Sequence, residues 1–121
     1  MAHRDIEHRT FRFALEIARL CDSLATSRFV IRRLSYQLLD AGTSVGANTE
    51  EAVGAQSHAD FIAKCAVVRK ESREARFWLR LLAALDPQLA NAVGKHATEA
   101  GELVAIFNAM IRTARSKHKR R

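Results

Sequence analysis

The chain has 121 residues, of which 48% are hydrophobic. This is enough for one domain with its own core, and it excludes disorder over most of the length. The formal net charge is +7 and the sequence pI is 10.3, so we expect a polyanion or an acidic protein surface as partner. No apolar run reaches the roughly 20 residues of a membrane-spanning helix, and the first residues lack the apolar core of a signal peptide. We therefore expect a cytoplasmic protein with no membrane contact.

The composition favours helices, because the chain has only 5 Gly and 1 Pro. Apolar residues at helical spacing predict four helices, at residues 5–24, 28–53, 58–85 and 87–115. Short connections between long helices make neighbours antiparallel. The predicted fold is all-α, an antiparallel up-down-up-down four-helix bundle. It forms a single domain over residues 1–115, and residues 116–121 are expected to be a flexible basic tail.

The first predicted helix has its apolar residues on one face, at spacings of three, four and seven. These residues are Ile6, Phe13, Ile17, Leu20 and Leu24. The pattern breaks after Leu24, and Ser27 is expected to cap the next helix. Cys21 here and Cys65 in the third helix lie in apolar contexts, which predicts reduced core cysteines.

The second predicted helix has an apolar stripe that contains a polar residue. The stripe is Ile31, Leu34, Leu38, Ala41, Val45, Asn48 and Ala52. Gly42 and Gly46 lie inside the same helix, which favours close packing against a neighbour. A buried Asn must find hydrogen-bond partners, and one such residue can fix the register or the oligomeric state. We expect Asn48 to have this structural role; ligand binding is the alternative.

The third predicted helix follows a stop at Gly54 and an N-cap at Ser57. Its apolar stripe is Phe61, Cys65, Val68, Ser72, Ala75, Leu79 and Leu82. Trp78 and neighbouring apolar residues widen this stripe toward the end of the helix. The extra width indicates a thicker end of the bundle, with a second partner surface as the alternative.

The fourth predicted helix begins after Asp86 as N-cap and Pro87 in the first turn. Its stripe is Leu89, Val93, His96, Ala100, Leu103, Phe107, Met110 and Ala114. We expect His96 to be a core histidine with satisfied hydrogen bonds. Gly94 and Gly101 each cost about 1 kcal/mol relative to Ala in a helix, so they are expected to mark a close approach of another helix.

The acidic residues do not make a metal centre by sequence. Glu51 and Glu74, with Glu50 and Glu71 beside them, suggest a di-iron bundle, but such bundles also use Glu-x-x-His motifs. This chain contains no Glu-x-x-His. No histidine is paired with a nucleophile at a supporting distance along the chain. We expect no cofactor, no metal and no catalytic residue. The charged third helix is expected to be a salt-bridged surface or a subunit contact.

The basic residues are candidates for nucleic-acid contact. They lie on the second and third helices and in the C-terminal segment: Arg32, Arg33, Lys64, Arg69, Lys70, Arg73, Arg76, Arg80, Arg115, Lys117, Lys119, Arg120 and Arg121. Tyr36 and Trp78 are the aromatic candidates for base stacking, and Trp78 is expected in the core. Binding should therefore be dominated by phosphates and weaken with salt. The alternative is a solvated charged surface without a ligand.

Residues 37–82 resemble, without gaps, a family called four-helix bundle proteins. The family includes proteins encoded in intervening sequences of bacterial large-subunit ribosomal RNA genes. The resemblance covers the segment Gly42–Asn48, Glu51, Ser57, Lys64, Lys70–Glu71, Arg73–Glu74 and Trp78–Leu82. Helix 5–24 matches more loosely, and helix 87–115 matches only in pattern. Thr49 stands where an aliphatic residue is common, and Phe77 stands where Tyr is common.

The resemblance implies a compact bundle that assembles as a homo-oligomeric ring, a pentamer. In this setting Gly42, Gly46, Asn48, Glu51, Glu74 and Trp78 are structural or assembly residues. A distant relative, the accessory protein of diversity-generating retroelements, is a basic pentamer that binds a reverse transcriptase and RNA. The sequence therefore predicts a non-enzymatic scaffold that binds nucleic acid or a ribonucleoprotein. The alternative is an interaction bundle for an acidic protein, with no nucleic-acid role.

Overall fold

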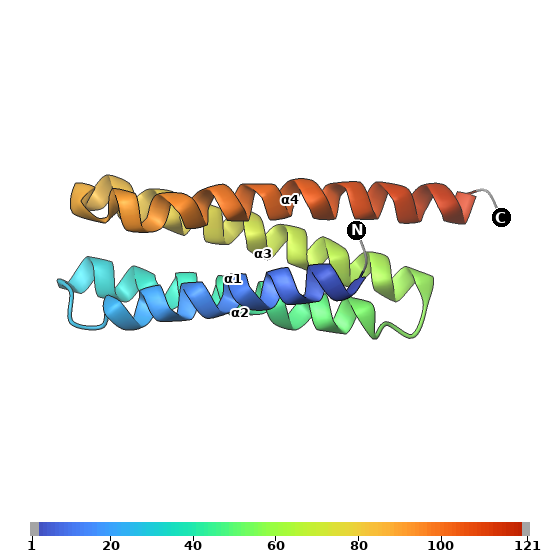
Figure 1. The fold of residues 1–121 in the computed structure, drawn as a ribbon, viewed down its shortest axis with the longest axis horizontal. Coiled ribbons are helices and arrows are strands. Elements are labelled where there is room, and N and C mark those ends of the chain that lie inside the picture. Colours follow the sequence, from blue (N-terminus) through green and yellow to red (C-terminus); the bar gives the residue numbers. More distant parts are fainter. Residues whose placement is uncertain (1–2, 120–121) are drawn as a thin grey trace.

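A computed structural model describes residues 3–119 of the chain. It consists of α1 (His3–Ser23), α2 (Phe29–Val53), α3 (His58–Leu85), a short 3-10 turn η1 (Pro87–Leu89) and α4 (Ala90–Lys119). Each helix runs back along the one before it (Figure 1). The predicted all-α, up-down-up-down four-helix bundle is confirmed. In the described part of the chain, no helix is both long and apolar enough to cross a membrane.

The helices pack mainly on their neighbours in the chain. α2 packs along α1, α3 along α2, and α4 along α3, whereas α1 and α4 meet only sparsely. Figure 1 shows α3 crossing obliquely from the side of α2 to the side of α4. The core is continuous and includes Ile17, Leu38, Leu79 and Phe107, each 0% exposed. The bundle is thus closed on three of its four interhelical sides and open between α1 and α4.

Two of the predicted helix starts are confirmed and one is wrong. Ser57 caps α3, because its hydroxyl accepts a hydrogen bond from the Asp60 N–H at 3.0 Å. Asp86 caps η1 through the Gln88 N–H. Ser27 does not cap α2: the N-cap position is Arg28, which makes no side-chain cap hydrogen bond. The predicted fourth helix also differs at both ends, since its first turn is the 3-10 turn and α4 continues past residue 115 to Lys119.

The apolar stripes of α1 and α3 are buried as predicted, apart from the half-buried Phe61. The stripe of α2 differs. Leu34 and Asn48 are half-buried, and Ser35, Gly42, Gly46 and Thr49 are buried as well. Gly42 and Gly46 let α1 pack tightly on α2, so the buried face of α2 is broader than one heptad stripe.

Gly42 and Gly46 lie where α2 packs tightly against α1. A Cβ on Gly42 would stand 2.6 Å from Ile17 Cγ2, and one on Gly46 would stand 3.3 Å from the Thr10 carbonyl oxygen. The same prediction of close approach is wrong for Gly94, which has no neighbour within 4 Å of an added Cβ. It is wrong for Gly101 as well, which meets only the flexible Arg76 side chain, at 3.5 Å.

Cys21 and Cys65 are both buried and free, as predicted. The Cys21 thiol donates to the Ser35 carbonyl oxygen at 3.3 Å. Burial raises the pKa of each thiol to about 11. Because the thiolate is the reactive form, these cysteines are packing residues and poor nucleophiles.

Candidate nucleic-acid interface

Four arginines of α3 lie on one flank of the helix. Arg69, Arg73, Arg76 and Arg80 follow one another at spacings of four, three and four, which keeps them on one side. This flank faces α4: the Arg69 guanidinium donates to Asn108 Oδ1 at 2.9 Å, and the Arg76 side chain lies over Gly101. Packing therefore turns four of the predicted residues toward a single interhelical surface.

The facing side of α4 adds positive charge and no carboxylate. Stepping three or four residues at a time from Gly101 leads through Ala105 and Asn108 to Arg112 and Arg115. Arg112 and Arg115 are exposed. We call the resulting surface the basic strip, defined by Arg69, Arg73, Arg76, Arg80, Arg112 and Arg115. In the described part of the chain, none of these arginines forms an ion pair with a carboxylate.

One end of the basic strip is hollowed into a notch of about 480 Å³. Its lining is Arg69, Asn108, Ile111, Arg112, Arg115 and Ser116. The polar groups here are three guanidiniums, an amide and a hydroxyl. Sequence reasoning missed Arg112, Asn108 and Ser116, because only the pairing of α3 with α4 brings them beside Arg69. The sequence signal for Arg112 was weak: it stands about one helical turn before Arg115, which was itself a predicted candidate.

The remaining predicted basic residues are not among the six that define the basic strip. Arg32 lies over the Phe29 ring, 5.8 Å from its centroid, and lines a groove between α1 and α2 with Tyr36. Lys64 is 4.0 Å from Asp60. Arg33 is exposed on α2. Lys70 is exposed on α3, and its spacing of three residues from Arg73 places it at the margin of the basic strip.

The candidate basic residues near the C-terminus also lie apart from one another. Lys117 lines an apolar groove of about 700 Å³ between the start of α3 and the end of α4. Lys119 is the last residue of α4, and Arg120 and Arg121 lie outside the described residues.

The opposite flank of α3 is acidic. Glu71 is half-buried there. Burial, Glu74 and Asp40 of α2 raise the pKa of its carboxyl group, and Lys70 acts in the opposite direction. Trp78 is half-buried against the core, and its indole N–H donates to Glu74 Oε1 at 3.4 Å. Glu51 is exposed near the end of α2. Over residues 69–80, the four arginines thus lie on one flank of α3 and the two glutamates on the other, which the order of residues along the chain conceals.

Phe77 is a further residue that sequence reasoning did not propose for ligand contact. Its side chain is 52% exposed and meets Trp78 edge-on, with ring centroids 5.0 Å apart. Phe77 is four residues after Arg73 and three before Arg80, so it adjoins the basic strip. An exposed aromatic ring beside guanidinium groups is a surface on which a base can stack.

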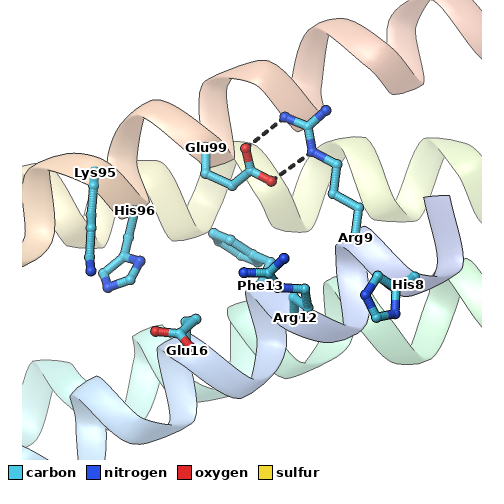
Figure 2. A pocket seen from close by; sticks show the side chains of 8 residues that line it. All are labelled: His8, Arg9, Arg12, Phe13, Glu16, Lys95, His96 and Glu99. Carbon is cyan, nitrogen blue, oxygen red and sulfur yellow. Dashed lines mark hydrogen bonds and ion pairs between the residues drawn. The ribbon is translucent and has the colours of Figure 1, made fainter. Parts of the chain in front are cut away.

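The open side between α1 and α4 forms a groove of about 460 Å³. Figure 2 shows the ion pair that spans it: Arg9 Nε and Nη2 each donate to a Glu99 carboxylate oxygen at 2.7 Å. Arg9 also reaches Glu102 at 3.1 Å. These bonds raise the pKa of the Arg9 guanidinium further above its already high value. The first and last helices are therefore joined by the Arg9–Glu99 ion pair, with little apolar contact between them.

His96 lies in this groove, which corrects the prediction of a core histidine. It is half-buried beside Lys95 and Glu16 (Figure 2). The pKa of His96 is lowered, chiefly by burial and then by Lys95, with Glu16 acting in the opposite direction. The stripe of α4 predicts a buried position here, but α1 does not come close enough to cover it.

No group of three or more His, Cys, Asp or Glu side chains that could hold a metal ion occurs in the described part of the chain. Glu51 and Glu74, the pair that suggested a di-iron centre, lie in different surroundings: Glu51 is exposed, whereas Glu74 is held by Trp78.

Comparisons with known proteins agree with this fold. The chain resembles a solved structure from Bacteroides thetaiotaomicron VPI-5482, described as a protein of unknown function from the S23 ribosomal protein family. The two are 32% identical, with a TM-score of 0.83, and the alignment covers 93% of this chain and 99% of the other. No curated protein matches. Residues 3–109 match the family described as 23S rRNA-intervening sequence protein. Since that match spans most of the chain, the protein belongs to the 23S rRNA-intervening sequence protein family.

Proposed function

We propose that this protein is a non-enzymatic scaffold that binds nucleic acid through the phosphates, using the basic strip. The observation that carries the proposal is the segregation of charge on α3. Six arginines share the surface between α3 and α4, and the described residues offer them no carboxylate partner. Guanidiniums that share one face and have no carboxylate partner are suited to phosphate oxygens, which accept two parallel N–H bonds.

The partner we propose is RNA or a ribonucleoprotein. The resemblance to the retroelement accessory protein, which binds a reverse transcriptase and RNA, supports this choice of partner. An exposed Phe77 next to the basic strip suits an unpaired strand, whose bases are free to stack. The alternative partner is an acidic protein, which would use the same arginines as ion-pair donors.

Self-assembly into a ring, with five copies as the favoured number, is part of the proposal. Large apolar side chains are exposed on the outer faces of α1 and α2: Phe11, Leu15, Phe29, Val30 and Tyr36. Exposed apolar groups of this size are typical of surfaces that meet another protein. A ring would present several basic strips to one polyanion, and linked contacts bind far more tightly than single ones.

The first test measures the affinity for an unstructured single strand as salt rises from about 50 to 200 mM. With six arginine–phosphate contacts, we expect log K to fall with log salt at a slope of roughly −4, about −0.7 for each contact. The double variant Arg73→Gln/Arg76→Gln should bind more weakly and reduce the slope by roughly 1.4. Fluorescence anisotropy with a labelled oligonucleotide gives both quantities.

A matched control removes the same charge elsewhere. Arg12→Gln/Arg33→Gln alters two exposed residues of α1 and α2, the helices that do not carry the basic strip, and should leave the slope close to that of the unmodified protein. If both double variants weaken binding equally, net charge rather than the basic strip explains the affinity. If the assembled protein binds no nucleic acid, the acidic-protein alternative is favoured instead.

A further inference from the structure

We infer that the notch at the end of the basic strip binds the terminal phosphate of a nucleic-acid strand, a phosphomonoester. The inference deepens the proposed function and rests on it, because the rest of the strand would lie along the basic strip. The notch is lined by Arg69, Asn108, Ile111, Arg112, Arg115 and Ser116.

The notch is preorganised around Arg69. This side chain is half-buried, and its guanidinium donates to Asn108 Oδ1 at 2.9 Å. The bond holds the guanidinium in place and leaves its other N–H groups as donors. It also orients the amide of Asn108: since Oδ1 accepts from Arg69, the amide nitrogen is left as a donor. Both side chains line the notch and keep N–H donors for an anion.

The charge of the notch suits a dianion. Its lining has three guanidiniums and no carboxylate. A phosphodiester in the middle of a strand has a single negative charge, whereas a phosphomonoester carries about −1.5 to −2 at neutral pH and has three acceptor oxygens. Three cations with further donors from Asn108 and Ser116 match the terminal group better than the internal one. The remaining arginines, Arg73, Arg76 and Arg80, would meet the diesters that follow.

The position of the notch suits a strand end. It lies where the row of α3 arginines meets the last turns of α4, so the basic strip leads away from it in one direction along α3. A volume of about 480 Å³ is enough for a phosphate and its attached sugar. The lining contains no aromatic side chain, so the base is not selected and the terminal phosphate is recognised whatever the sequence.

The test compares three short single strands of the same sequence, labelled at the 3′ end. They differ at the 5′ end, which is a hydroxyl, a phosphate or a methyl-esterified phosphate. We expect the 5′-phosphate strand to bind about tenfold more tightly than the 5′-hydroxyl strand, equivalent to about 1.4 kcal/mol. The methyl ester adds almost the same atoms with only one charge, so it should lose most of this preference.

Variants assign the preference to the notch. Arg112→Gln/Arg115→Gln should bring the 5′-phosphate and 5′-hydroxyl affinities together. Asn108→Asp, which places a carboxylate against Arg69 and keeps every arginine, should do the same. The matched control Arg73→Gln/Arg80→Gln removes equal charge outside the notch, so it should weaken both strands and preserve their ratio. Circular dichroism and thermal unfolding confirm that each variant is folded.

The outcomes separate the inference from the proposed function. Equal binding of all three strands by the unmodified protein overturns the terminal-phosphate inference and leaves the proposed function standing. Absence of binding to the 5′-hydroxyl and 5′-phosphate strands alike overturns both. Displacement of the 5′-phosphate strand by micromolar inorganic phosphate would assign the notch to a free anion and overturn the inference, because a strand end should gain from the basic strip as well.

Discussion

At the scale of single residues, the glycines of this protein divide into two kinds. Gly42 is buried against α1, and a Cβ there would stand 2.6 Å from Ile17 Cγ2 and 2.9 Å from Ile17 Cβ. Gly94 is exposed, with no neighbour within 4 Å of an added Cβ. None of the described glycines has a positive φ, so available space rather than backbone conformation decides what each substitution does.

We therefore expect Gly42→Ala and Gly94→Ala to change stability in opposite directions. Gly42→Ala should lower the free energy of unfolding by about 1–3 kcal/mol, because α1 and α2 must move apart at a tightly packed point. Gly94→Ala should raise it by up to about 1 kcal/mol, because Ala is the better helix former. Urea unfolding monitored by circular dichroism measures both changes. A stabilising Gly42→Ala would show that α1 and α2 have room for the added Cβ at this point and that the contact with Ile17 is not tight.

At the scale of helices, the open side between α1 and α4 depends on polar contacts. The Arg9–Glu99 ion pair and the half-buried His96 lie on this side, and apolar packing there is sparse. Because the pKa of His96 is below its usual 6.5 in the folded protein, the unfolded chain binds a proton more readily than the folded one. The stability associated with neutral His96 is then present above about pH 6.5 and is lost as the pH falls through this value.

We expect the free energy of unfolding to decrease between pH 7.5 and pH 5.5, with part of the decrease due to His96. His96→Gln should flatten the profile in this range, since glutamine does not titrate. His8→Gln is the matched control, an exposed histidine of the same groove, and it should keep the original profile. Urea unfolding at several pH values provides the comparison. Identical profiles for His96→Gln and the unmodified protein would contradict the assignment.

At the scale of the whole molecule, the single chain leaves surfaces that suit further copies of itself. Large apolar side chains are exposed on α1 and α2, and Asn48 is only half-buried. The Asn48 amide donates to the Ser44 carbonyl oxygen of its own helix at 2.9 Å. Its role in assembly is therefore a proposal in which the side-chain oxygen accepts a hydrogen bond from a neighbouring subunit.

Light scattering coupled to size-exclusion chromatography is expected to show a ring of about five copies, and absorbance at two wavelengths reports any nucleic acid that copurifies. Asn48→Leu should change the oligomer size while helicity is kept, because a seam Asn can select the oligomeric state. Asn91→Leu is the matched control, at an exposed position of α4. A monomeric unmodified protein would contradict the ring, and unchanged assembly of Asn48→Leu would remove Asn48 from the interface.

The sequence by itself determined the fold class, the helix order and most of the core. Spacings of three and four residues place the apolar side chains of α1 and α3 on the faces that are buried, and local signals such as Ser57 and Asp86 act within a few residues of themselves. The caps depend on interactions that are short-range along the chain. The buried faces depend on a periodicity of apolar residues that is the same whichever helix packs against them.

Only the tertiary structure decided which faces of the helices are in contact and which charged residues become neighbours. The broad buried face of α2, the exposed setting of Gly94 and the groove position of His96 all follow from which helices touch. The notch joins Arg69 to Asn108, Arg112 and Arg115 because α3 and α4 run antiparallel at one register. Side chains about 40 residues apart become neighbours through that register, which depends on packing across the whole interface and so cannot be read from spacing along one helix.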